Sequence, residues 1–254
     1  MAFGASARNS PTRAWASSGG GANVGDLFRA RRHMILLTGF YHDPSPVRTE
    51  EFLECIRRNS ANPHIDHIAV FLEEQISTSQ PEALVPAMAH PKVQLIPHGK
   101  RLTFADLFEH ANRHLVDARV VIANADIFFD ETLALLKAEP IEGRMFCLSR
   151  WDEAADGTLR HFDRPYSQDA WIFQPPLPRL VSDFCLGKLG CDNRLAYEAE
   201  RAGLIVSNPS RSVRARHLHL SAVRRYTRKD RLAGPTRLVP ALFLGLDPQG
   251  AKGH

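Results

Sequence analysis

An amide and an acidic side chain directly follow one strongly apolar segment of the chain. The β-branched run Arg119-Val120-Val121-Ile122-Ala123 is typical of a buried strand, and Asn124-Ala125-Asp126 comes immediately after it. A carboxylate at the carboxyl end of a strand can hold a divalent cation, and the Asn124 amide adds an oxygen ligand. Asn and Asp are also favoured in turns, where they bond to the nearby backbone, so a plain turn is the alternative interpretation.

Two histidines near the carboxyl end of the chain are separated by a single residue. His217 and His219 follow the strand-like segment 212–215, and alternate residues of an extended chain point to the same side. Both imidazoles could then bind a metal ion or form hydrogen bonds to phosphate. Several arginines, among them Arg216, surround the pair, and arginine suits planar contact with phosphate oxygens. A solvated basic face is the alternative for any single arginine.

Two further acids and one basic pair are candidates for a cleft. Asp192 stands at the start of a predicted helix, where Asp is a good cap, but a capping carboxylate at a cleft edge can also act as a general base. Asp169 precedes the apolar segment 170–173 and is the second candidate acid, with a solvent-exposed loop acid as the alternative. Lys100-Arg101 lies between a predicted strand and a predicted helix and could meet a phosphate.

The segments that must position these residues alternate between strand and helix patterns. Apolar runs predict strands over 34–38, 67–72, 93–96, 119–123, 145–149, 170–173 and 204–206. Helices are expected from Thr49 to Arg58, over 81–89, after Thr103 and from Asp192 to Ala202. Thr49 and Thr103 are the predicted caps of the first and third of these helices. This alternation predicts an α/β fold, a single Rossmann-like domain with a central, mostly parallel sheet flanked by helices. Ligands of such sheets bind beyond the carboxyl ends of the strands, where the candidate residues fall.

Length and composition exclude several classes of protein. The chain has 254 residues, of which 44% are hydrophobic and 24% charged, and these are ordinary values for a soluble globular protein. No segment approaches the ~20 consecutive apolar residues of a membrane span. The four cysteines show no C-x-x-C spacing, so neither a disulfide framework nor a zinc knuckle is expected, and a cytoplasmic location is the simplest context.

The net charge of +4 is distributed unevenly along the chain. Residues 1–33 hold five arginines and one aspartate among many Gly, Ala and Ser residues, which predicts a disordered basic leader. Residues 34–210 hold 17 basic and 25 acidic residues, and residues 211–254 hold ten basic and two acidic ones. We therefore expect a domain over 34–227 and a basic, partly disordered tail over 228–254. Such ends could contact anionic lipid peripherally, but the absence of interleaved aromatic residues gives no expectation of nucleic-acid binding.

The order of these features resembles that of the GT-A fold glycosyltransferases, which use nucleotide-sugar donors, and is most similar to their large inverting family. That family includes processive polysaccharide synthases and many single-sugar transferases. Its D-x-D motif follows a central strand, where this chain has Asn124-Ala125-Asp126. Its catalytic Asp opens a helix that is followed by Arg, Ala-Gly, a strand, Pro and a His. Here the order is Asp192, Arg201, Ala202-Gly203, Ile205-Val206, Pro209 and then His217 or His219, so that the resemblance covers about residues 34–225.

Three features depart from the pattern of that family. Asn124 replaces the first acid of the motif and removes one charge from the metal site. Cys191, rather than an acid, precedes the expected base. No Q-x-x-R-W motif follows, which argues against a processive synthase.

The resemblance implies metal-dependent transfer of a sugar from a nucleotide-sugar to a glycan or another hydroxyl acceptor, with inversion at the sugar. Asp126 with His217 or His219 would hold Mn²⁺ or Mg²⁺, and imidazole ligation favours Mn²⁺. Asp192 would take the proton of the acceptor hydroxyl, with Asp169 as the second candidate base. The residues expected to contact substrate are Thr38, Gly39, Arg101, Asn124, Trp171 and Arg216.

Two other functions remain open for the same residues. A metal-dependent hydrolase or nucleotidyltransferase could use the Asp and His ligands to activate water, although such a site usually needs more ligands than this sequence offers. A non-catalytic module that binds a nucleotide or a sugar is the other alternative, because Asn124 could mark a transferase that has lost activity. Hydrolysis of a nucleotide-sugar without acceptor would favour the first, and binding without turnover would favour the second.

Overall fold

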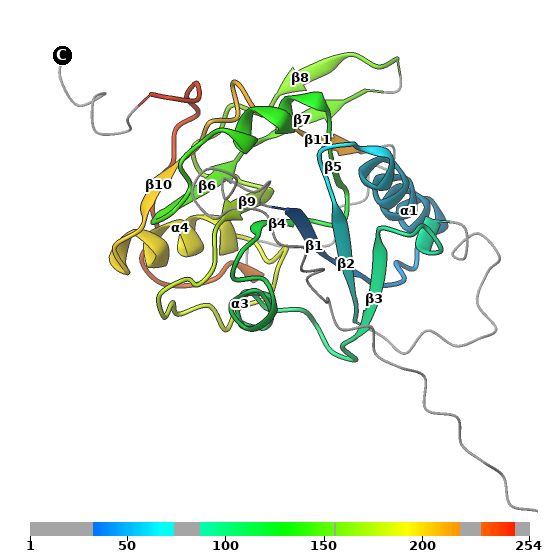
Figure 1. Cartoon of the computed structure of the whole chain (residues 1–254), viewed down its shortest axis with the longest axis horizontal. Coiled ribbons are helices and arrows are strands. Elements are labelled where there is room, and N and C mark those ends of the chain that lie inside the picture. Colours follow the sequence, from blue (N-terminus) through cyan, green and yellow to red (C-terminus); the bar gives the residue numbers. More distant parts are fainter. Residues whose placement is uncertain (1–32, 74–86, 155, 219–229, 247–254) are drawn as a thin grey trace, which may run out of the picture. The chain divides into compact units, whose positions relative to one another are not determined.

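A seven-stranded sheet forms the centre of the computed structural model (Figure 1), which describes residues 33–73, 87–154, 156–218 and 230–246. Its strands, in spatial order, are β10 (Ile205–Ser207), β6 (Arg144–Leu148), β9 (Ala170–Phe173), β4 (Arg119–Ala123), β1 (Met34–Phe40), β2 (His67–Leu72) and β3 (Val93–Pro97). Neighbouring strands are parallel except at β9, which runs antiparallel to both β4 and β6. The predicted α/β class with a mostly parallel sheet is therefore confirmed.

Helices cover both faces of this sheet. They are α1 (Pro46–Ala61), α3 (Phe104–His114), the 3-10 helix η1 (Glu131–Lys137) and α4 (Cys191–Arg201). Strand β1 shows how the sequence supports two cores, because Ile35 and Leu37 pack in the core that contains α3 and α4, whereas Met34 and Leu36 pack in the core that contains α1. Figure 1 shows α3 and α4 on one side of the sheet and α1 on the other. A strand buried on both faces reads as a continuous apolar run, as β1 does.

A second sheet of four short strands extends beyond the carboxyl ends of the central strands. Its order is β5 (Ile127–Phe129), β11 (Ala215–Leu218), β7 (Arg150–Glu153) and β8 (Leu159–His161). Strand β11 pairs antiparallel with β5 and parallel with β7, which places His217 opposite both Ile127 and Asp152. The sequence predicts a strand-like segment over 212–215 but no second sheet. Strand β11 begins at Ala215, later in the sequence than the predicted segment, because residues 209–213 form a turn. In this turn the backbone N–H groups of Ser212 and Val213 both donate to the Pro209 carbonyl.

Two predicted helix starts are wrong. Helix α1 begins at Pro46 after Ser45, three residues before the predicted Thr49 cap, because proline is already shaped for the first helical position. Helix α4 begins at Cys191 after Gly190, which has a left-handed backbone (φ 84°), so Asp192 lies inside the first turn and is not the cap. The helix expected over 81–89 falls mostly outside the described residues.

The segment 230–246 packs on the domain that the sequence predicts to end at residue 227. Val239 is buried in the core beside α4, and its backbone N–H donates to the Pro165 carbonyl (2.8 Å). The Leu242 N–H donates to the Asn208 carbonyl (2.8 Å) at the end of β10. The proposed leader over 1–33 lies outside the described residues except for His33. Among the described helices, none combines the length and the apolar character needed to cross a membrane.

Helix α3 starts with the capping arrangement that the sequence predicts at Thr103. The Thr103 hydroxyl accepts a hydrogen bond from the Asp106 N–H (3.2 Å), and the Asp106 carboxylate accepts one from the Thr103 N–H (3.0 Å). We expect Thr103→Ala to lower the free energy of unfolding by about 1 kcal/mol, because this reciprocal cap is lost. Urea unfolding followed by circular dichroism measures the change.

The matched control for the cap is Ser45→Ala. Ser45 also precedes a helix, but its side chain makes no capping hydrogen bond. This variant should change the free energy of unfolding by less than about 0.5 kcal/mol. Equal losses in Thr103→Ala and Ser45→Ala would contradict a specific contribution of the Thr103 cap.

Candidate functional site

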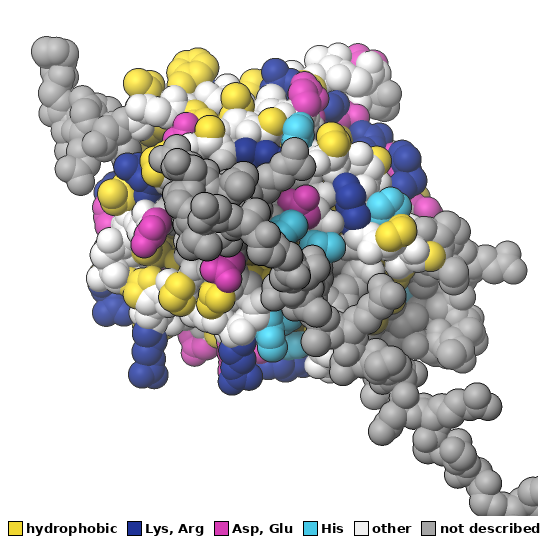
Figure 2. Space-filling view, in the orientation of Figure 1, with side chains coloured by type: hydrophobic (Ala, Val, Ile, Leu, Met, Phe, Trp, Pro, Cys, Tyr) yellow, Lys and Arg dark blue, Asp and Glu magenta, His cyan; other side chains and the backbone are white. Residues whose placement is uncertain are grey.

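A cleft of about 1090 Å³ lies at the carboxyl ends of the central strands. Its described lining includes Gly39 near the end of β1, Glu73 after β2 and Arg101 after β3, together with Asn124 and Asp126 after β4. Asp169, Asp192 and His217 complete the set of predicted residues that the structure brings into this cleft. Figure 2 shows basic, acidic and histidine side chains interspersed over one face of the molecule, so the charge exposed there is mixed in sign.

Asp126 and His217 are in direct contact at the floor of the cleft. His217 Nε2 lies 3.2 Å from Asp126 Oδ2, and His217 Nδ1 lies 2.9 Å from Asp152 Oδ1. The register of the small sheet produces this arrangement, because β11 lies between β5, which directly follows Asp126, and β7, which carries Asp152. A carboxylate on Nδ1 fixes the orientation of an imidazole and leaves Nε2 to act in the site.

The charges of this trio depend on one another. Burial alone would lower the pKa of His217, but Asp126 and Asp152 raise it to about 9. Burial would likewise raise the pKa of Asp126, yet His217 and Arg48 hold it well below its usual range. Similar contacts with His217 and Arg150 lower the pKa of Asp152 to about 2. A cation that binds at His217 must therefore displace a proton from it.

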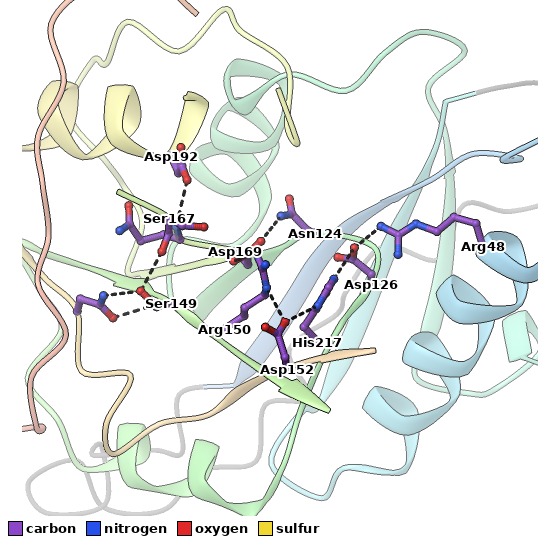
Figure 3. Close-up of polar contacts among 12 residues, drawn as sticks. Arg48, Asn124, Asp126, Ser149, Arg150, Asp152, Ser167, Asp169, Asp192 and His217 are labelled. Atoms are coloured by element: carbon purple, nitrogen blue, oxygen red, sulfur yellow. Dashed lines mark hydrogen bonds and ion pairs between the residues drawn. The ribbon is translucent and has the colours of Figure 1, made fainter. Parts of the chain in front are cut away.

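Arg48 of α1 forms an ion pair with the Asp126 carboxylate (Figure 3). It forms a second ion pair with Glu51 (2.6 Å). Arg48 was not among the predicted site residues. It stands in the first turn of a helix, where a basic residue is unfavourable for the helix dipole. That unfavourable position was the signal in the sequence that could have indicated a functional role for Arg48. Only the packing of α1 against β5 shows that the guanidinium reaches the cleft.

Arg150 contacts two acids of the cleft, Asp152 and Asp169, and so links the His217 contacts to Asn124. Its Nε donates to Asp152 Oδ1 (2.7 Å), and its Nη1 lies 3.4 Å from Asp169 Oδ2. Asp169 Oδ1 in turn accepts a hydrogen bond from Asn124 Nδ2 (3.0 Å). Figure 3 shows the resulting chain of contacts from Arg48 to Asn124. Burial raises the pKa of Asp169, and Arg150 opposes that rise.

Asp192 lies farther along the same cleft, on the other side of Asp169 in the view of Figure 3. Its Oδ2 accepts a hydrogen bond from the Gln168 N–H and its Oδ1 one from the Asn193 N–H, both 3.1 Å long. Burial raises the pKa of Asp192 to about 6, and the charge of Asp169 adds to the rise. A carboxylate with such a pKa is poised to accept a proton near neutral pH.

Three residues predicted to contact substrate lie outside the described lining of the cleft. Trp171 is 0% exposed and packs edge-to-face on Phe104 (4.8 Å between ring centroids), because β9 is covered on both faces. Thr38 points to the neighbouring strand, where its hydroxyl donates to the Ala123 carbonyl (3.0 Å). Arg216 points away from His217 along β11 and pairs with Glu153 (2.6 Å). Trp171 thus lies in the core rather than in the lining of the cleft, and His219 lies outside the described residues.

The polar atoms at the end of β4 fit a divalent cation in part. Asn124 Oδ1 and Asp126 Oδ1 are buried oxygens with no hydrogen-bond partner among the described residues. Buried acceptors of this kind normally have a partner. The Asp126 carboxylate and His217 Nε2 together offer one oxygen and one nitrogen ligand. No group of three His, Cys, Asp or Glu side chains is placed to hold a metal ion within the described part of the chain. The remaining positions of a cation would thus have to come from substrate oxygens and water.

Comparison with known proteins gives information about the fold. No family model and no curated protein matches the sequence. A solved structure of the mannosyltransferase PcManGT from Pyrobaculum calidifontis, in complex with GDP-Man and Mn²⁺, is similar to this chain with a TM-score of 0.50 and 16% sequence identity. The match covers 74% of this chain but only 57% of the mannosyltransferase chain.

A solved 4-diphosphocytidyl-2C-methyl-D-erythritol synthase is also similar, with 16% identity over 56% of this chain and 75% of the synthase, but its TM-score of 0.36 is too low to carry an argument. At these identities the likeness concerns the arrangement of the elements alone. This chain has a seven-stranded, mostly parallel sheet with helices on both faces, and its fold is similar to that of the mannosyltransferase. This chain therefore has a GT-A-like, Rossmann-type fold.

Proposed function

We propose that this protein transfers a sugar from a nucleotide-sugar donor to a hydroxyl acceptor in a metal-dependent, inverting reaction. The observation that carries the proposal is the contact of His217 Nε2 with Asp126, whose second carboxylate oxygen has no hydrogen-bond partner among the described residues, in a cleft that also holds Asp192. The mannosyltransferase with the similar fold is described in complex with GDP-Man and Mn²⁺, which supports a nucleotide-sugar and a divalent cation as ligands.

Asp126 and His217 would hold the cation, which when bound would neutralise negative charge on the leaving diphosphate. The softer imidazole ligand favours Mn²⁺ over Mg²⁺. Asp152 orients His217 through Nδ1 and keeps Nε2 directed at the site. Arg48 lies at the same carboxylate and can contribute a second positive charge toward the diphosphate.

Asp192 acts in this proposal as the general base. As the acceptor oxygen forms its bond to the anomeric carbon, the bond between that carbon and the diphosphate oxygen breaks, and the acceptor proton passes to the Asp192 carboxylate. The two backbone N–H groups that bond to Asp192 hold its carboxylate in place. Asp169 is the second candidate for the same role because it is the neighbouring buried acid of the cleft.

The two alternatives are a metal-dependent hydrolase and a module that binds without turnover. The hydrolase would direct water, rather than an acceptor hydroxyl, at the same carbon. The binding module would keep the diphosphate contacts and lack turnover. The hydrolase and the binding module would both use the proposed cation site. Binding measurements therefore do not distinguish them from a transferase, whereas the reaction products do.

Titration calorimetry of the wild-type protein with a panel of nucleotide-sugars, with and without Mn²⁺, tests the proposal. We expect at least one donor to bind only when Mn²⁺ is present and to give a glycosylated product with a glycan or other hydroxyl acceptor. Binding that is the same without Mn²⁺ would contradict the metal site. Release of free sugar faster than any transfer would favour the hydrolase, and Mn²⁺-dependent binding without turnover would favour the binding module.

A further inference from the structure

The carboxylate of Asp192 is held by backbone groups from two different segments of the chain. It accepts the N–H of Asn193, which follows it in α4, and the N–H of Gln168, which lies 24 residues earlier. Two bonds to one carboxylate do not by themselves fix the distance between these segments. The place of the carboxylate therefore depends on what keeps the first turn of α4 beside residue 168.

The Asn193 side chain makes contacts that do this. It is 1% exposed, and its Nδ2 atom donates to the Arg237 carbonyl (2.8 Å) and to the Pro165 carbonyl (3.4 Å). An amide nitrogen carries two protons, so both bonds can form at once. The Arg237 N–H donates back to the Asn193 carbonyl (3.0 Å). One buried side chain thus ties α4 both to the turn that leads to Gln168 and to the segment 230–246.

The Pro165 carbonyl is the point at which three segments meet. Besides Asn193 Nδ2, it accepts hydrogen bonds from Gln168 Nε2 (3.2 Å) and from the Val239 N–H (2.8 Å). Gln168 and Val239 are 2% and 4% exposed, so these bonds lie away from solvent. Gln168, whose N–H holds Asp192, is therefore fixed by its own side chain to the oxygen that Asn193 also reaches.

The segment 230–246 also reaches the cleft. The Leu232 N–H donates to the Leu189 carbonyl (2.9 Å), two residues before α4 begins. Asp230 lines the cleft together with Asp192. The segment therefore follows the turn of α4 that carries Asp192, from the cleft to the Pro165 carbonyl.

We propose that Asn193 is a positioning residue, whose amide keeps the first turn of α4 beside Gln168 and so holds the Asp192 carboxylate in place in the cleft. This inference rests on the proposed function for the role of Asp192 as the base. Loss of the amide would remove the bonds to the Arg237 and Pro165 carbonyls and let the first turn of α4 and Gln168 move apart. The carboxylate would then become more open to water.

Titration of Asp192 tests the inference without any substrate. The pKa of Asp192 is raised to about 6 mainly by burial, and the charge of Asp169 adds to the rise. The other titratable groups beside it are the thiols of Cys147 and Cys191, and burial raises the pKa of both, so neither titrates near pH 6. If Asn193→Ala opens the carboxylate to water, the pKa of Asp192 should fall toward the ordinary range of an aspartate.

The titration is followed by ¹³C NMR of protein labelled at the aspartate carboxyl groups, in which the Asp192 signal is the one lost in Asp192→Asn. Kinetics of Asn193→Ala should show kcat lowered by roughly 10- to 100-fold with the donor Kd unchanged, because a displacement of about 1 Å can cost as much. The pH at which the rate rises should fall together with the pKa of Asp192.

Asn112→Ala is the matched control. Asn112 also lies in a helix, α3, and its amide also bonds to the backbone of a distant segment, through the Leu177 carbonyl (3.2 Å) and the Leu177 N–H (2.8 Å). Both residues are outside the described lining of the cleft. This variant should lose stability, as Asn193→Ala does, but keep the wild-type pKa of Asp192 and the wild-type kcat. Thermal unfolding shows which variants are folded, and Asn193→Ser, which keeps one shorter donor, is titrated if Asn193→Ala does not fold.

Two results would overturn the inference. One is a folded Asn193 variant in which Asp192 titrates as in the wild type. The other is an equal change of pKa and kcat in Asn112→Ala, which would reveal a general loss of stability instead of positioning. Both leave the proposed function intact. A wild-type protein that gives no glycosylated product would overturn the proposed function, whereas the titration would still decide whether Asn193 holds Asp192.

Discussion

Asp192→Asn is expected to reduce kcat for sugar transfer by about 10²–10⁴-fold while donor binding stays close to that of the wild type. The amide has nearly the shape of the carboxylate and can still accept one of the two backbone hydrogen bonds that hold Asp192. It cannot accept a proton from the acceptor hydroxyl. Steady-state kinetics, with Mn²⁺ and the donor that calorimetry identifies, measures the loss of kcat. The donor Kd shows whether donor binding is unchanged.

The pH dependence of the same reaction gives an independent check. A base must be ionised to act, and the pKa of Asp192 is raised to about 6. The wild-type rate should therefore rise with pH as the pH passes through about 6 and level off above it. That rise should be absent from the residual activity of Asp192→Asn. A transfer rate near the wild-type value in the variant would exclude Asp192 as the base and leave Asp169 as the candidate.

Asp126→Asn should abolish most Mn²⁺-dependent binding of the donor, with a loss on the order of 100-fold, or about 2.7 kcal/mol. The carboxylate is the charged member of the donor set, and its free oxygen is one of the two that have no described partner. The substitution also leaves Arg48 and His217 without the acid that both contact. We therefore expect a lower unfolding temperature as well, because buried cations lose their counter-charge.

Calorimetry with and without Mn²⁺ measures the effect of Asp126→Asn, and a thermal melt confirms that the variant is folded at the temperature used. Asp163→Asn serves as the control, because it removes an exposed acid from an ion pair with Arg211 that lies outside the described lining of the cleft. Donor binding that keeps its wild-type strength and its dependence on Mn²⁺ in Asp126→Asn would mean that the cation is held elsewhere.

The central sheet is largely predictable because its strands are buried on both faces. The segments 67–72, 119–123 and 170–173 have the same bounds in the sequence analysis and in the structure. In each, an unbroken apolar run is ended by polar residues, and no other element of a soluble domain buries such a short run so completely. The same burial hides the place of Trp171, because a run that is apolar on both sides does not show which side chains face a cleft and which lie in the core.

The small sheet could not be predicted from local patterns. Strand β7 reads Arg-Trp-Asp-Glu, with three charged residues of four, and β5 and β8 have only three residues each. These strands form because they pair with one another around β11, an interaction between segments that lie far apart in the sequence. Asp152 was missed for the same reason.

For the candidate site, residue order placed Asp126, Asp192 and His217 in one cleft, and the structure brings them there. Their roles in chemistry stay predictions. Arg48 and the contact between Asn124 and Asp169 depend on packing and on the direction of β9, and neither can be read from the spacing of residues.

The pairing of β11 sets a limit on how the length of this chain can vary. Side chains alternate along a strand, so a shift of β11 by one residue would place Arg216 where His217 now meets Asp126 and Asp152. An insertion of one residue between Pro209 and Ala215 would have to be accommodated in the turn that precedes β11. Otherwise the register would shift and His217 would leave the site, although the sequence would still contain every residue of the site. In proteins that share this site, the number of residues that leads to the histidine is therefore constrained as strictly as the histidine itself.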